Sequence, residues 1–349
     1  MGEEIHDGYA DLVGRNLGRF LMEVGAEDPE LESEVLVELS RLKDDSLGRV
    51  LLAPETTRFL MWPDVSRDVT APARRLIKSV RAELARDGET AEAISDPVWT
   101  ALGDALILPG GRVVHAPSVK GIAALDLDSP YALSVDVQGV DFAVTECHVS
   151  LSGTEREDAL AKLSAATECI SLVNSEILRF VEKFTKTLIL VRDDSESIFS
   201  SGSCAQYVGR SVLGNPQLSF VDEVTIAEGV VHESIHGLLY MHETMESWVL
   251  DESLFGGGPT VSSPWTGRTL PIRPFLQACF VWYGLFRFWS IASETGHFVS
   301  KRVMQRREAA ARGFAKESLV GLVQPYTGDL NHHLIEAIDD LQGRVQKSL

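Results

Sequence analysis

An HExxH motif at residues 232–236 constrains this 349-residue chain more than any other feature. Its two histidines, His232 and His236, are four residues apart, so on a helix they share one face and can bind a single metal ion. A Thr-Ile-Ala-Glu capping box at 225–228 predicts that this helix begins about two turns before His232. A Leu-Ser-Phe-Val run at 218–221 predicts a short strand ahead of it. A strand followed by a capped helix that carries HExxH is the arrangement that a zincin-like metal site requires.

The overall charge of the chain argues against two classes of partner. The sequence contains 51 acidic and 32 basic residues, which gives a formal net charge of −19 at pH 7. Such a charge repels the phosphates of nucleic acids and the headgroups of anionic membranes, so we expect neither as a partner. No apolar run is as long as a membrane span, the first residues are acidic, and the four cysteines form no CxxC pair. These features favour a cytoplasmic protein.

The spacing of apolar residues predicts a mostly helical α+β fold with two regions. We expect an N-terminal helical region at residues 1–105 and an HExxH catalytic domain at residues 106–349. In the second region the zincin-like strand and the HExxH helix should pack against further helices and a small antiparallel sheet. Helices are predicted at 11–24, 29–42, 72–84, 154–184, 275–293, 301–323 and 330–345. Strands are predicted at 112–115, 132–137, 142–145 and 187–192.

A third metal ligand is expected, because two histidines rarely hold a metal ion alone. Gln277 is one candidate, since it is a polar residue in an apolar predicted helix and its side-chain oxygen could bind the metal or orient a ligand. Asp251 and Glu252 are its rivals, because they follow the HExxH helix at the distance where other HExxH enzymes supply a carboxylate. His242 lacks the preceding glycine that would end the helix and turn it back, so we expect it to point away. The histidine pair at 332–333 is expected at the surface.

The segments around and after the motif resemble those of a known family. Ser263-Pro-Trp-Thr is followed by Arg273-Pro-Phe-Leu-Gln and by a predicted helix that contains Phe-Trp at 288–289. Together with HExxH, this order resembles the HExxH-motif peptide-modification proteins, which occur in gene clusters for ribosomally made, modified peptides. A Ser-rich stretch at 200–203 is also similar to the family. The resemblance covers residues 187–289.

The resemblance implies an oxygenase that depends on Fe²⁺ and 2-oxoglutarate and hydroxylates a β-carbon within a precursor peptide. It implies that His232 and His236 hold the Fe²⁺ and that Gln277 lies among or beside the ligands. Glu233 would then orient a ligand or support the fold.

The resemblance also implies where the co-substrate and the partners would bind. Arg273 would bind the distal carboxylate of 2-oxoglutarate, because a guanidinium group binds a carboxylate through two hydrogen bonds. Arg268 is its rival, since the loop between the two family segments is longer than usual. The partners would be the precursor peptide and other peptide-maturation enzymes.

Two other functions remain open on the sequence. Two histidines with a carboxylate or amide oxygen suit Zn²⁺ for hydrolysis as well as Fe²⁺ for oxygen activation. In a zinc metallopeptidase, Glu233 would be the general base that deprotonates a zinc-bound water. The third function is that of a non-catalytic peptide-binding protein whose HExxH motif is vestigial.

Overall fold

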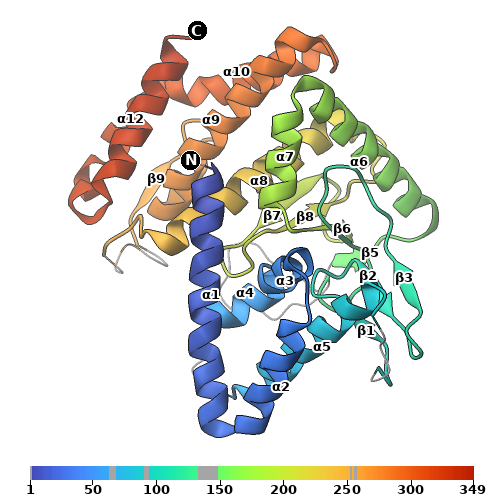
Figure 1. Ribbon diagram of the computed structural model, residues 1–349. Coiled ribbons are helices and arrows are strands. Elements are labelled where there is room, and N and C mark those ends of the chain that lie inside the picture. Colours follow the sequence, from blue (N-terminus) through green and yellow to red (C-terminus); the bar gives the residue numbers. More distant parts are fainter. Residues whose placement is uncertain (1, 63–67, 90–93, 133–147, 252–253, 255–257) are drawn as a thin grey trace.

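The computed structural model describes residues 2–62, 68–89, 94–132, 148–251, 254 and 258–349, and it confirms a mostly helical α+β fold (Figure 1). The described helices are α1 (Gly2–Glu27), α2 (Pro29–Ser40), α3 (Asp44–Leu51), α4 (Pro54–Met61), α5 (Thr70–Arg86), α6 (Gly153–Val173), α7 (Ser175–Phe184), α8 (Glu223–Met245), α9 (Ile272–Thr295), α10 (Ser300–Lys316), α11 (Leu319–Val323) and α12 (His332–Gln346), with a 3-10 helix, η2 (Gln324–Asp329). The described strands are β1 (Val98–Trp99), β2 (Ala105–Ile107), β3 (Val113–His115), β4 (Leu125–Asp126), β5 (His148–Ser150), β6 (Thr187–Asp193), β7 (Ser200–Ser203), β8 (Arg210–Gly214), β9 (Thr260–Ser262) and β10 (Thr269–Pro271). Figure 1 shows α8, which carries the HExxH motif, between the N-terminal helices and the C-terminal helices.

The N-terminal helices pack directly against the HExxH helix. The helices α1 and α5 contain two of the predicted helices, and α2 ends at Ser40, two residues before the predicted end at 42. The eight-residue helices α3 and α4 were not predicted. The apolar side chains of these helices form a core that also includes Phe184 at the end of α7 and Met241 in α8. This region therefore helps to position α8, and the division at residue 105 stays a prediction.

Two small sheets are antiparallel, as predicted, and a larger sheet is mixed. The small sheets are β1–β2–β3 and β9–β10. In the larger sheet β6 lies parallel to β4 and β8, while β5 and β7 run antiparallel to their neighbours. The predicted strands at 112–115 and 187–192 are confirmed as β3 and β6. Those at 132–137 and 142–145 lie outside the described residues, apart from Ala132, which is in a turn.

The HExxH helix begins three residues earlier than the capping box predicts. Asp222 is the N-cap of α8, and its carboxylate accepts hydrogen bonds from the backbone N–H (3.0 Å) and the hydroxyl (2.7 Å) of Thr225. Because Asp222 already caps the helix at the N–H of Thr225, Thr225 lies inside the helix and the predicted cap is wrong. The predicted strand at 218–221 is also wrong, since the backbone there forms turns, and the strand that leads to α8 is β8.

Polar residues divide two of the predicted long helices. Asn174 ends α6 and caps α7, where its side chain accepts a hydrogen bond from the N–H of Glu176 at 2.8 Å. Ser318 separates α10 from α11 and accepts a hydrogen bond from the N–H of Gly321 at 3.0 Å. In both places a short polar side chain replaces the helical hydrogen bond of the backbone. In the described part of the chain, every helix is too short or too polar to cross a membrane.

Candidate metal centre

The two histidines of the motif lie side by side on one face of α8. The centroids of the His232 and His236 rings are 5.0 Å apart, and the ring of His236 stacks on that of Tyr240 at 5.6 Å. All three side chains line a cavity of about 510 Å³, whose other walls include the end of β10, the start of α9 and the segment after β7. The His232 side chain is 32% exposed, so this space is open to solvent. The motif therefore presents two imidazole rings to one cavity.

A chain of hydrogen bonds fixes the ring of His236. Its Nδ1 atom lies 3.0 Å from Oε1 of Gln277, and Nε2 of Gln277 donates to Glu243 at 3.0 Å. The other oxygen of Glu243 accepts from Nε of Arg273 at 2.6 Å. Because a carboxylate only accepts, the amide NH₂ group of Gln277 must face Glu243 and its oxygen must face His236. Nδ1 of His236 therefore carries the proton, and its Nε2 keeps a lone pair for a metal ion.

The environment of His236 also favours the neutral ring. Burial of the imidazole, and then the proximity of His232, lower the pKa of His236 to about 4. At pH 7 the ring is therefore neutral, which is the form that binds metal ions. This agrees with the hydrogen-bond chain, in which one ring nitrogen is protonated and the other is not.

The carboxylate of Glu233 is bonded to β7. The side chain is only 2% exposed, and its two oxygens accept hydrogen bonds from the hydroxyls of Ser201 (2.7 Å) and Ser203 (2.6 Å). Alternate residues of a strand share a face, so both serines reach the same carboxylate. One oxygen of Glu233 lies 3.9 Å from Nε2 of His232, and Glu233 is not among the described residues that line the cavity. These contacts tie the HExxH helix to the edge strand.

The remaining predicted site residues divide between the cavity and the surface. Gln277 and Arg273 line the cavity, whereas Arg268 is exposed in the turn between β9 and β10 and is not brought to it. Asp251 is exposed beyond the end of α8 and does not line the cavity. Glu252 lies outside the described residues. The third metal ligand therefore stays a prediction.

Four residues that support the histidines were missed on the sequence, namely Tyr240, Glu243, Ser201 and Ser203. Tyr240 and Glu243 follow His236 by four and seven residues, a spacing that keeps them on the same face of α8. That spacing could have revealed Glu243, but an acid near the end of a helix reads as a surface residue. The alternation of the two serines in a strand could likewise have placed both hydroxyls on one side.

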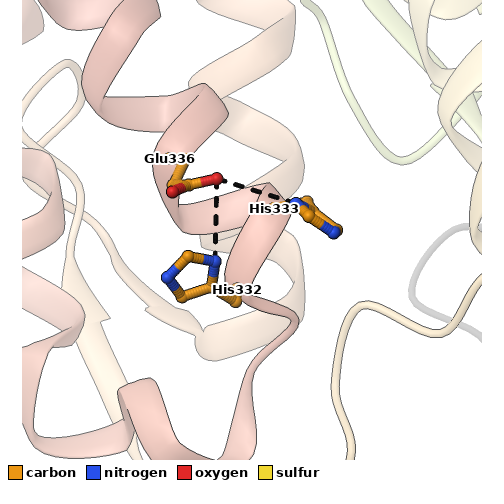
Figure 2. A group of neighbouring side chains, drawn as sticks. All are labelled: His332, His333 and Glu336. Atoms are coloured by element: carbon orange, nitrogen blue, oxygen red, sulfur yellow. Dashed lines mark ion pairs between the residues drawn. The ribbon is translucent and has the colours of Figure 1, made fainter.

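A second group of potential ligands lies at the exposed start of α12 (Figure 2). His332 and His333 each lie 3.6 Å from Glu336, and all three side chains are exposed, as expected for the histidine pair. Within the described ranges, this is the only group of three His, Cys, Asp or Glu side chains whose ligand atoms could share one ion. The positive end of the helix dipole disfavours a cation at this place.

No model of a known protein family matches this chain, and none of the curated proteins is significantly similar to it in sequence.

Proposed function

We propose that this protein is an oxygenase of the HExxH-motif peptide-modification type, dependent on Fe²⁺ and 2-oxoglutarate. It would convert a β-carbon C–H of one residue in a ribosomally made precursor peptide to C–OH. In the same reaction, 2-oxoglutarate and O₂ would become succinate and CO₂, with the second oxygen atom going to the peptide. The observation that carries the proposal is the hydrogen-bond chain from His236 to Arg273.

The guanidinium group of Arg273 supports binding of 2-oxoglutarate. Glu243 engages only its Nε, and none of the described residues accepts a hydrogen bond from its two terminal nitrogens. Two such nitrogens match the two oxygens of a carboxylate, so Arg273 is suited to the distal carboxylate of the keto acid. Gln277 and Glu243 link this group to His236, so one network would hold both the metal ligand and the co-substrate.

The donors in the cavity are compatible with Fe²⁺. His232 and His236 offer two imidazole nitrogens, and Gln277 orients the second ring. The oxygen of Gln277 is already engaged by His236, which favours an orienting role for it over direct ligation. When bound, the iron would supply the activation of O₂ that C–H hydroxylation requires.

The contacts of Glu233 favour the oxygenase over a zinc metallopeptidase. A peptidase of the HExxH type needs this glutamate to face the metal-bound water as a general base. Here both of its oxygens accept hydrogen bonds from serines of β7. We infer that Glu233 holds α8 against the edge strand and takes no proton from a substrate.

Turnover of 2-oxoglutarate tests the proposal. With Fe²⁺, ascorbate and O₂, the protein should convert 2-oxoglutarate to succinate, most strongly when the precursor peptide is present. The peptide should gain the mass of one oxygen atom and remain uncleaved. Arg273→Ala should raise the concentration of 2-oxoglutarate required by about 100-fold, because a charge-assisted pair contributes a few kcal/mol. Arg268→Ala is the matched control, and it should leave this requirement unchanged.

Two further variants decide between the three functions. Glu233→Gln should retain most of the turnover, because the serine hydroxyls can donate to one end of the amide and accept from the other. Cleavage of the peptide under Zn²⁺ that Glu233→Gln abolishes would instead establish a metallopeptidase. Equal metal content in the wild type and in His232→Ala/His236→Ala would rule out the metal site and leave the peptide-binding function.

A further inference from the structure

Helix α10 is strongly basic in an acidic chain. It contains six basic side chains and one acidic one, which gives a formal net charge of +5, whereas the whole chain carries −19. Two of the basic side chains, Arg302 and Arg306, are one turn apart and line a cavity of about 610 Å³. Basic side chains are thus concentrated on one element, and two of them line a cavity, each paired with an acidic side chain.

This cavity lies beside the candidate metal centre. Its opposite wall is a single face of α8, formed by Thr225, Glu228, Gly229 and His232, and its other wall includes Ser200 and Ser201 of β7. His232 also lines the cavity that holds Gln277 and Arg273. A ligand held at His232 can therefore extend into either cavity.

The dimensions of α8 set how much of a peptide the second cavity can hold. Thr225 and His232 are seven residues apart, which is about 10 Å along a helix at a rise of 1.5 Å per residue. An extended peptide covers the same length with about three residues, at about 3.3 Å each. A peptide residue near Arg302 and Arg306 would therefore lie within about three positions of the residue at His232.

The two arginines are held in place yet keep hydrogen-bond donors. Nη1 of Arg306 pairs with Glu228 at 2.7 Å, and the other oxygen of Glu228 accepts from the indole of Trp289 at 2.8 Å. Both terminal nitrogens of Arg302 lie 3.3 Å from the carboxylate of Asp222, and Nη2 also donates to the hydroxyl of Thr225 at 3.2 Å. A guanidinium group has five N–H donors, so Arg306 has further donors to offer an incoming carboxylate.

We propose that this second cavity recognises an acidic side chain of the peptide substrate, within about three residues of the residue presented at His232. The inference rests on the proposed function in one respect, namely that the site acts on a peptide. The basic surface of α10 would attract the acidic segment, and Arg302 and Arg306 would bind its carboxylate. A nucleic acid is disfavoured, because the net charge of the chain repels a long polyanion.

Binding of short labelled peptides to the metal-free protein in EDTA tests this inference. The probe is a fluorescein-labelled hexapeptide of alternating Ala and Glu, compared by fluorescence anisotropy with its Ala and Gln counterpart. The Glu peptide should bind, and the Gln peptide should bind at least about tenfold more weakly. Arg302→Gln/Arg306→Gln should lower affinity for the Glu peptide by at least about tenfold, and added salt should weaken its binding to the wild type.

Two control variants make the result specific to the cavity. Arg312→Gln removes an exposed charge from the same helix outside the cavity lining, and it should change affinity by less than about twofold. Glu228→Gln removes the acid that competes for Arg306, so it should tighten binding of the Glu peptide. A gain in affinity cannot come from loss of folding.

Several results would overturn the inference. One is equal affinity for the Glu and Gln peptides. Another is a loss of affinity in Arg312→Gln as large as that in Arg302→Gln/Arg306→Gln. A third is tighter binding of a six-nucleotide DNA or of phosphatidylserine vesicles than of the Glu peptide. Because the assay contains no active metal centre, the two proposals fail separately. Peptide binding without 2-oxoglutarate turnover would reject the oxygenase alone, and turnover without preference for the Glu peptide would reject the acidic subsite alone.

Discussion

Gln277 lies between the imidazole ring of His236 and the carboxylate of Glu243, and it bonds to both. The two ends of its amide have opposite hydrogen-bonding capacity, so only one orientation satisfies both neighbours. A buried amide in an otherwise apolar stretch of helix is costly unless both ends are bonded. Gln277 therefore fixes the tautomer of His236 in which Nδ1 carries the proton and Nε2 keeps its lone pair.

Replacing Gln277 by leucine should weaken metal binding while the fold is kept. Without the acceptor at Nδ1, the ring of His236 is free to change tautomer and orientation, and loss of such a partner costs about 10- to 100-fold in metal affinity. Titration with Co²⁺, followed by absorbance, measures the affinity. His242→Asn is the control, since His242 bonds to the indole of Trp248 and does not line the cavity. An unchanged affinity in Gln277→Leu would show that the hydrogen-bond chain does not orient a ligand.

The serines that hold Glu233 should matter for stability. Ser201→Ala or Ser203→Ala leaves one oxygen of a buried carboxylate without its donor, which should lower the free energy of unfolding by about 1–3 kcal/mol. Urea denaturation measures the change. Adding Glu233→Gln to the double serine variant should recover part of the loss, because a neutral amide is less costly to bury than a charge. If stability is not recovered, the serines stabilise the fold through contacts other than those with Glu233.

At the scale of elements, α8 is positioned from several sides at once. It contacts α1, α6, α7 and α9, and its Glu233 is bonded to β7. Gly237, directly after the second histidine, lies where a Cβ atom would come within 2.3 Å of the carbonyl oxygen of Phe184. This glycine therefore lets α8 approach the end of α7 closely, and the position of His236 depends on that approach.

Gly237→Ala should destabilise the protein despite the better helix propensity of alanine. The added methyl group must displace backbone atoms, which costs about 1–3 kcal/mol, against a propensity gain of up to about 1 kcal/mol. Gly18→Ala is the matched control, because Gly18 is exposed within α1 and a Cβ there meets no atom within 4 Å. The free energy of unfolding of Gly18→Ala should rise by about 0.5–1 kcal/mol. Thermal unfolding of each variant measures the change in stability. A gain in stability in both variants would contradict the close approach of α8 to the end of α7.

The elements that could be predicted are those whose residues repeat a pattern over several turns. The long helices α1, α5 and α9 follow from apolar spacing, but the eight-residue helices α3 and α4 are too short to show it. Most strands span two to five residues, so their sequence does not specify which neighbour they pair with or in which direction.

The site was predictable where a residue is unusual for its surroundings. His232 and His236 stand out by their spacing, and Gln277 stands out because its helix is apolar. Glu243 does not stand out, because an acid on an amphipathic helix is ordinary, and only the fold brings it to Gln277. The sequence could not choose between Arg273 and Arg268, because the choice depends on where the β9–β10 hairpin ends and α9 begins.

At the scale of the whole molecule, the N-terminal helix α1 meets the segment that leads into β6 at a partly buried lysine. Nζ of Lys186, which precedes β6, lies 3.1 Å from Nε2 of His6 in α1. The ring of His6 also packs edge-on against Phe184. Burial, and then the nearby charge of Lys183, lower the pKa of the Lys186 amine to about 8. This junction therefore carries a charge that the folded state disfavours at neutral pH.

Replacing Lys186 by methionine should change how stability depends on pH. The amine has a pKa near 8 in the folded state and near 10.5 when unfolded, so between these values the unfolded chain binds more protons. The contribution of Lys186 to the free energy of unfolding should therefore rise from pH 8 to pH 10.5 and be smallest at pH 7.

Urea denaturation of the wild type and of Lys186→Met at pH 7 and pH 9.5 measures this contribution. The variant should be more stable than the wild type at pH 7, and it should keep less than half of that advantage at pH 9.5. Lys316→Met, at the exposed end of α10, should leave the difference between the two pH values unchanged. The same result for both variants would mean that the junction between α1 and β6 does not disfavour the charge.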